Sequence, residues 1–76
     1  MKDEVLALIM TKCKSLVGDQ PMDAATRFED LGAKSVDLVK MIAVLEDEFG
    51  VDINFMEFRR QKTFGEAAEY VARLAG

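Results

Sequence analysis

The sequence predicts an all-α protein, a four-helix bundle with three longer helices, one short third helix and a long first loop. Apolar residues recur at helical spacing in three separate segments, glycines stand where two of these segments end, and no stretch alternates apolar and polar residues as a strand would. With 76 residues, of which 50% are hydrophobic, the chain can form one modest core. We therefore expect a single domain over residues 1–76.

The first helix is expected from about Asp3 to Val17. Its apolar stripe consists of Val5, Leu6, Ile9, Cys13, Leu16 and Val17. Gly18 follows and is a natural helix stop. Cys13, the only cysteine, cannot form an internal disulfide, and its place on the stripe predicts a core residue with no functional role.

Residues 18–34 form the long first loop, because they contain Pro21, Gly32 and many polar side chains without helical periodicity. Loops of this length are uncommon unless they are functional or locally packed. We expect Phe28 and Leu31 to anchor the loop in the core, and the loop has room for a short helical turn.

The second helix is expected from about Ser35 to Phe49, ending at Gly50. Its buried stripe is Leu38, Met41, Ile42, Leu45 and Phe49. A second apolar stripe, rotated away from the first, consists of Val36, Val39 and Ala43. This second stripe is either extra core or an exposed strip for a partner. The acidic side chains that border it, Asp37, Glu46 and Asp47, favour the partner.

Two shorter segments complete the bundle after an extended connector at residues 51–53. Asn54, with an acidic residue three positions later, predicts the start of a short third helix over about 55–61. Thr63 and Glu66 form a capping box for the last helix. The expected buried stripe of that helix is Phe64, Ala67, Ala68, Val71 and Leu74.

Composition argues against an enzyme, a metal site and a nucleic-acid binder. The chain has no histidine, no Gly-rich phosphate loop and no paired metal-ligand cysteines. Its formal net charge is −4, and residues 29–57 hold eight acidic side chains against two lysines. Such a segment disfavours nucleic acid and anionic membranes and favours partners with basic patches, unless it is only a solvated face.

The sequence also favours a soluble, cytoplasmic, monomeric protein without stable membrane association. No run of 18 apolar residues is present, and the first residues are too acidic and too quickly amphipathic for a signal peptide. The unpaired cysteine fits a reducing compartment. A charged bundle with one modest apolar strip is expected to make transient contacts.

Ser35 is the main candidate for a functional residue, because it stands between a polar loop and an apolar helix. A hydroxyl at this place would be exposed at the positive end of a helix dipole, where free N–H groups favour an attached phosphate. The alternative is that Ser35 simply caps its helix.

Two segments together resemble the acyl carrier protein family: residues 28–37, FEDLGAKSVD, and residues 45–53, LEDEFGVDI. The resemblance covers nearly the whole chain and includes the order of the helices. It implies that a phosphopantetheinyl transferase attaches 4′-phosphopantetheine from coenzyme A to Ser35. The terminal thiol of this arm would carry an acyl group as a thioester, delivered to partner enzymes in fatty acid, polyketide or related biosynthesis.

The resemblance also implies a partner surface for the synthases or ligases that load and use the acyl group. Its apolar positions align with Val36, Val39 and Ala43, and its acidic positions with Asp37, Glu46 and Asp47. Two positive charges depart from the family pattern. Lys34 stands where the family usually has an aspartate, and Lys40 lies on the same helix, so we expect a dedicated set of partners.

The cargo is expected to be short or polar, such as an aminoacyl group or a small polyketide unit. In fatty acid carriers the acyl chain folds back between helices, and here Phe55, Met56, Phe58 and Gln61 of the third helix are expected to fill that space. Residues 57–59 also resemble the corresponding stretch of D-alanyl carriers. The sequence is also compatible with a different class of function, that of an unmodified helical module for protein–protein interaction.

Overall fold

The computed structural model describes residues 1–76 and contains four α-helices, one short 3₁₀ helix and no strand. The elements in order are α1 (Lys2–Val17), η1 (Glu29–Leu31), α2 (Ser35–Phe49), α3 (Phe55–Arg60) and α4 (Phe64–Ala75). The predicted all-α bundle with a short third helix is therefore confirmed, and the second helix has the expected bounds. The helical turn in the long first loop is η1.

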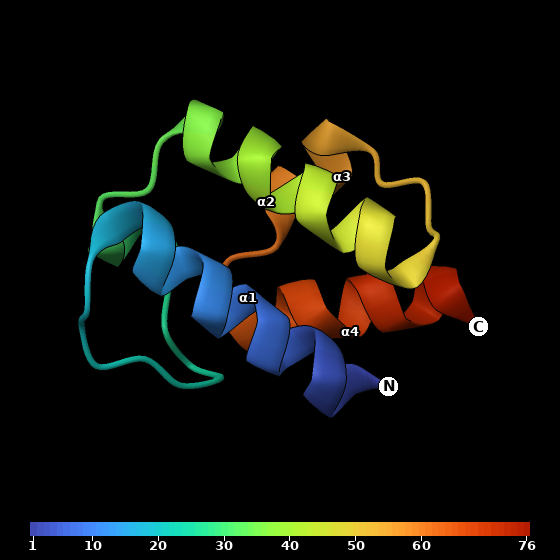
Figure 1. The fold of residues 1–76 in the computed structure, drawn as a ribbon, viewed down its shortest axis with the longest axis horizontal. Helices are drawn as coiled ribbons and strands as arrows, with labels where there is room; N and C mark the ends of the chain where they lie inside the picture. The colour runs from blue at the N-terminus through green and yellow to red at the C-terminus, as the bar shows by residue number, and fades with distance from the viewer.

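The helices pack in pairs around α1. This helix packs most extensively against α4 and also contacts α2, while the short α3 lies beside α2 (Figure 1). The long first loop leaves the C-terminal end of α1 and passes the N-terminal end of α4 before it reaches α2 (Figure 1). The molecule measures 30 × 22 × 19 Å along its principal axes.

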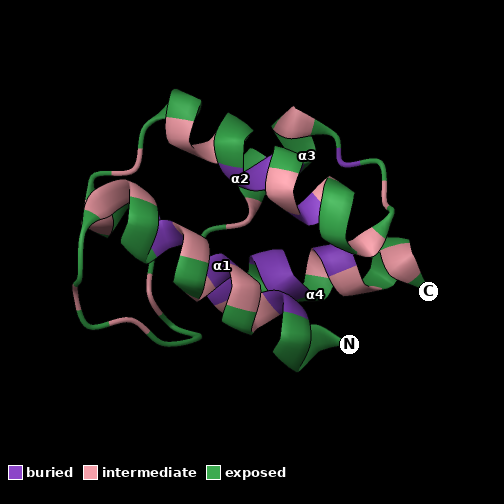
Figure 2. Cartoon of the chain, in the orientation of Figure 1, coloured by how far each residue is buried: buried purple, intermediate pink, exposed green.

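The core is entirely apolar. Thirteen residues are buried, all of them hydrophobic, and all but Phe28 and Ile53 lie on the inner faces of the helices (Figure 2). At its centre three aromatic rings from different segments meet: Phe28 from the loop lies 4.7 Å from Phe64 and 5.9 Å from Phe58 between ring centroids. Tilted ring pairs at such distances are favourable beyond the area they bury. The loop is therefore fastened to the core, as expected for Phe28.

Backbone hydrogen bonds fasten the same loop to the start of α4. The N–H of Phe64 donates to the carbonyl of Thr26 at 2.9 Å, and the N–H of Gly65 donates to the carbonyl of Ala24 at 2.8 Å. A Cβ at Gly65 would lie 3.0 Å from that Ala24 oxygen, a tight contact, so the close approach favours glycine. These bonds satisfy donors in the first turn of α4, which have no partner within the helix.

The helix ends follow the local signals of the sequence. Gly18 and Gly50 end α1 and α2 with positive φ angles of 97° and 63°. The Asn54 side chain accepts a hydrogen bond from the Glu57 N–H at 3.0 Å at the start of α3. Thr63 and Glu66 form the predicted capping box of α4.

The centre of the predicted core is confirmed, whereas some expected stripe positions pack against it only partly buried: Leu6, Leu16, Val17, Leu38 and Phe49. Cys13 is 1% exposed, as expected for a core residue. Leu74, which the periodicity predicts on the buried stripe of α4, is 44% exposed, because it lies in the last turn of α4, where no other element covers it. Leu31, the second expected anchor of the loop, is only half-buried.

The cluster of three aromatic rings predicts how much stability the protein loses when the Phe28 side chain is shortened. We expect Phe28→Ala to lower the free energy of unfolding by about 3–5 kcal/mol, because it leaves a cavity between two buried rings. Urea denaturation followed by circular dichroism measures the change. Met56→Ala, at a side chain 58% exposed, is the control and should stay within about 0.5 kcal/mol of the parent. Equal effects of the two substitutions would contradict the central role of Phe28.

Candidate functional site

Ser35 is the first residue of α2, and Lys34 before it occupies the N-cap position with extended backbone angles, φ −104° and ψ 173°. The interpretation of Ser35 as a helix cap is therefore wrong, because the helix starts at Ser35 itself, one residue earlier than a serine cap would require. The Asp37 carboxylate accepts a hydrogen bond from the Lys34 N–H at 2.9 Å, which is one half of a capping box. The Lys34 side chain has no acceptor and cannot supply the other half. The Ser35 hydroxyl is exposed and plays no part in capping.

The surroundings of Ser35 suit a phosphate ester. The first hydrogen bond of α2 joins the Leu38 N–H to the Lys34 carbonyl at 3.1 Å, so the N–H groups of residues 35–37 precede the helical ladder. They lie at the positive end of the α2 dipole, where a negative charge is stabilised by about 0.3–1 kcal/mol at an exposed site. The residues present thus fit a phosphate group on the Ser35 oxygen.

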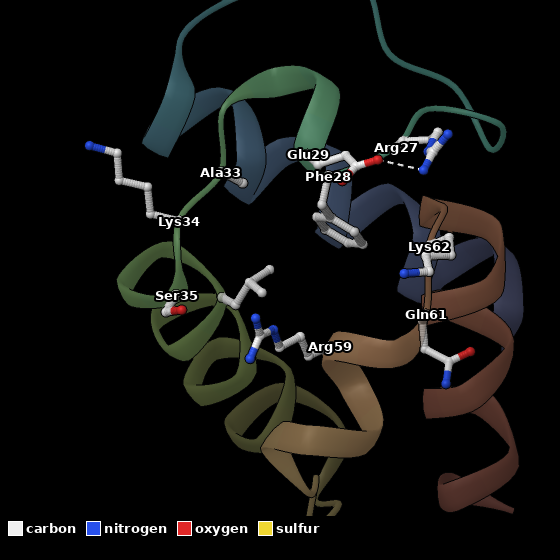
Figure 3. Close-up of a pocket in the computed structure, with 10 residues that line it drawn as sticks. Arg27, Phe28, Glu29, Ala33, Lys34, Ser35, Arg59, Gln61 and Lys62 are labelled. Atoms are coloured by element: carbon white, nitrogen blue, oxygen red, sulfur yellow. Dashed lines mark hydrogen bonds and ion pairs between the residues drawn. The ribbon is translucent and has the colours of Figure 1, made fainter.

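A cleft of about 490 Å³ opens beside Ser35 (Figure 3). Three segments of the chain form it: the loop around η1, the first turn of α2, and the end of α3 with the residues that follow. Its lining residues are Arg27, Phe28, Glu29, Ala33, Lys34, Ser35, Leu38, Arg59, Gln61 and Lys62. Four of them are cationic and only one is acidic.

The charges of the cleft are largely unpaired. Arg27 forms an ion pair with Glu29 on the rim, which leaves Lys34, Arg59 and Lys62 without a carboxylate partner. The Arg59 side chain extends toward Ser35 across the cleft, whereas the Lys34 side chain points away from it (Figure 3). The cleft is therefore positive in a protein whose formal net charge is −4.

The second apolar stripe of α2 is exposed. Val36 and Val39 are 57% and 54% exposed, and Ala43 is also in the exposed class. Lys34, Lys40 and Asp47 are exposed as well. The possibility that this stripe is extra core is thus excluded for the isolated chain.

Asp37 and Glu46, the other two acidic residues predicted to contact partners, also form hydrogen bonds that stabilise the fold. Asp37 and Glu46 are both half-buried. Glu46 accepts a hydrogen bond from the Ile53 N–H at 2.8 Å, which ties the connector before α3 to the last turn of α2. Each carboxylate thus holds one end of α2, and of the three only Asp47 is exposed with no hydrogen bond or ion pair.

Cys13 is no part of the site. Burial raises the pKa of its thiol, and the negative charge of Asp37 raises this pKa further. The thiol therefore stays protonated and unreactive at neutral pH.

The expectation that bulky third-helix residues fill the space near the arm is only partly right. Phe58 is buried in the core and Phe55 packs against the core partly buried, but Met56 is exposed and Gln61 lines the open cleft. Sequence reasoning missed Arg27, Arg59 and Lys62 as neighbours of Ser35. No local pattern could have shown them, because the fold brings them together from distant segments. No group of three or more possible metal ligands is found, and no helix is long and apolar enough to span a membrane.

Comparison with known proteins identifies the family. A family model described as a phosphopantetheine attachment site matches residues 3–71. An acyl carrier protein of Lactobacillus acidophilus is 40% identical over 75 residues, which cover 90% of this chain and 94% of that protein. The chain belongs to the acyl carrier protein family. The carrier is also similar to a chloroplastic acyl carrier protein of Brassica campestris, 44% identical over 73 residues that cover 93% of this chain and 53% of that one. It spans about half the length of such chloroplastic relatives.

Membership implies a covalently attached 4′-phosphopantetheine. Acyl carrier proteins are carriers and not catalysts, which supports the prediction from composition that this chain is not an enzyme.

Glu46 and Asp47, the two acidic residues near the end of α2, should differ in how much they contribute to the free energy of unfolding. We expect Glu46→Ala to lower the free energy of unfolding by about 1.5 kcal/mol, because the half-buried Ile53 N–H loses a charged acceptor. Asp47→Ala, its matched control, removes an exposed carboxylate and should change stability by less than about 0.5 kcal/mol. Thermal or urea unfolding of both variants measures this. A Glu46→Ala variant as stable as Asp47→Ala would show that the hydrogen bond contributes nothing.

Proposed function

We propose that this acyl carrier protein holds acyl intermediates as thioesters on a 4′-phosphopantetheine arm attached to Ser35. It would deliver them to partner enzymes in fatty acid, polyketide or related biosynthesis. The observation that carries this proposal is the position of the Ser35 hydroxyl, which is exposed in the first turn of α2 and is not used as a cap. The family match supports it, since the model describes a phosphopantetheine attachment site.

The chain's own residues would receive and orient the arm. A transferase forms a bond between the Ser35 oxygen and the phosphorus next to pantetheine in coenzyme A. The bond from that phosphorus to the bridging oxygen of the pyrophosphate breaks, and adenosine bisphosphate leaves with this oxygen. The serine proton passes to a base of the transferase, because no side-chain group of the chain is hydrogen-bonded to this hydroxyl. The free N–H groups of α2 then face the phosphodiester. The arm supplies the thiol that accepts the acyl group, which the buried Cys13 cannot do.

The exposed face of α2 is the proposed docking surface for the transferase and for the enzymes that load and use the acyl group. Val36, Val39 and Ala43 offer its apolar contacts. The charged positions around them are Lys34, Asp37, Lys40, Glu46 and Asp47. Asp37 and Glu46 add to the negative field of this face even while their carboxylates hold the helix ends. Contacts of this size are expected to be transient.

We further propose a monomer in the cytoplasm. The support for the compartment is the single unpaired cysteine, and the support for the monomer is the modest size of the apolar strip on a charged chain.

The decisive experiment is intact-mass measurement after coexpression with a broad-specificity phosphopantetheinyl transferase. The parent chain should gain the mass of one phosphopantetheine arm, and Ser35→Ala should not, since its side chain has no oxygen to modify. Ser15→Ala is the matched control, because Ser15 is also exposed but lies within α1. This variant should be modified as fully as the parent. No gain of mass in the parent would favour the unmodified interaction module.

Lys34 should govern the choice of transferase. With a transferase that serves fatty acid carriers, we expect Lys34→Asp to raise the initial rate of modification severalfold, because it restores the charge usual in the family beside Ser35. Lys14→Asp is the control for net charge, since Lys14 is exposed on α1 far along the chain from the site. Equal rates for the parent and Lys34→Asp would contradict a role for Lys34 in partner choice.

A further inference from the structure

The cleft beside Ser35 concentrates positive charge that the fold itself does not use. Ten side chains of the protein are cationic, and four of them form ion pairs with carboxylates. Three of the remaining six line this one cleft: Arg59 and Lys62, whose side chains enter it, and Lys34, whose side chain points away from it (Figure 3). None of these three side chains forms an ion pair within the chain, whose net charge is −4. These unpaired cationic side chains can therefore bind an anion from outside the chain.

The cleft also has an apolar wall. Phe28, Ala33 and Leu38 line it, and Phe28 is one of the core rings, so the wall is held firmly in place. Arg59 and Lys62 enter the cleft from different sides: the Arg59 guanidinium extends toward Ser35, and the Lys62 amine points into the cleft from the side opposite Ser35 (Figure 3). A volume of about 490 Å³ is typical of a small-molecule site. Wall and charges together fit a ligand with a short hydrocarbon segment and an anionic end.

We propose that the cleft selects a short acyl cargo that ends in a carboxylate, with Arg59 and Lys62 holding the carboxylate and Leu38 and Phe28 contacting the methylene groups. This inference rests on the proposed function, because the cargo reaches the cleft on an arm attached to Ser35. The tether raises the local concentration of the cargo to the millimolar range, so weak ion pairs are sufficient for occupancy.

The same charges disfavour two other cargoes. The ammonium group of a D-alanyl or other aminoacyl cargo would meet Arg59 and Lys62, and like charges repel. A long alkyl chain would place its end against Arg59, Gln61 and Lys62, which would lose contact with water without gaining a partner. Of the cargoes open to a carrier, the carboxylate-terminated acyl group is the one that the cleft complements.

The pKa of the cargo carboxyl group tests the proposal. A broad-specificity transferase transfers glutaryl-phosphopantetheine to Ser35 from glutaryl-coenzyme A that is labelled with ¹³C at the terminal carboxyl, and adenosine bisphosphate leaves. NMR then follows the titration of the labelled carboxyl group. We expect a pKa about 0.5 lower than in free glutaryl-pantetheine, the size that exposed ion pairs support. The lowering should disappear in the Arg59→Gln/Lys62→Gln variant and shrink in high salt, because nearby cations stabilise the ionised form.

A charge-matched control separates the cleft from the net charge of the protein. The Arg60→Gln/Arg73→Gln variant removes two positive charges outside the cleft and should keep the low pKa. Pentanoyl carrier, which has the same chain length without the carboxylate, should lack the chemical-shift changes that glutaryl causes at Arg59 and Lys62.

The outcomes are distinct. A carboxyl pKa equal to that of the free compound would overturn the proposal. So would identical shifts in the glutaryl and pentanoyl carriers, because the cations would then be contacting only the phosphodiester of the arm. Failure to load Ser35 at all would instead refute the proposed function. Unchanged dispersion in the spectra of both double variants excludes misfolding, since all four substituted side chains are exposed.

Discussion

The fastening of the long first loop is the constraint on which the rest of this structure depends. Fixing a loop of this length costs conformational entropy. Two kinds of contact offset this cost: Phe28 packs between two core rings, and two backbone hydrogen bonds join the loop to the start of α4. Because the loop leads directly into α2, the same contacts fix where Ser35 stands. They also make one wall of the cleft, so the core and the site share a residue.

Local signals in the sequence predicted most of the fold. Helical periodicity, the glycines at positions 18 and 50 and the box of Thr63 and Glu66 describe interactions within a few residues, and such interactions can be read from a single chain. The exposure of Leu74 could not be predicted, because periodicity gives the direction of a side chain and not whether another element covers it.

The site was predictable only in part, for the same reason. Ser35 stands within a continuous motif, whereas Arg59 of α3 and Lys62 of the following connection line the same cleft only because α3 packs against α2 in the fold. Asp37 and Glu46 show a further limit. Their spacing on α2 suggested partner contacts, and the structure reveals that each also serves the backbone, which no pattern of charges along a helix can disclose.

The burial of Cys13 has a consequence for any molecule that transports thioesters. A second reactive sulfur on the surface could take over the acyl group by exchange, and it could join two carriers through a disulfide. With its thiol enclosed in the core and kept protonated, this chain contributes no competing nucleophile of that kind. Chemical fidelity in such a carrier thus depends partly on a residue that takes no part in transport.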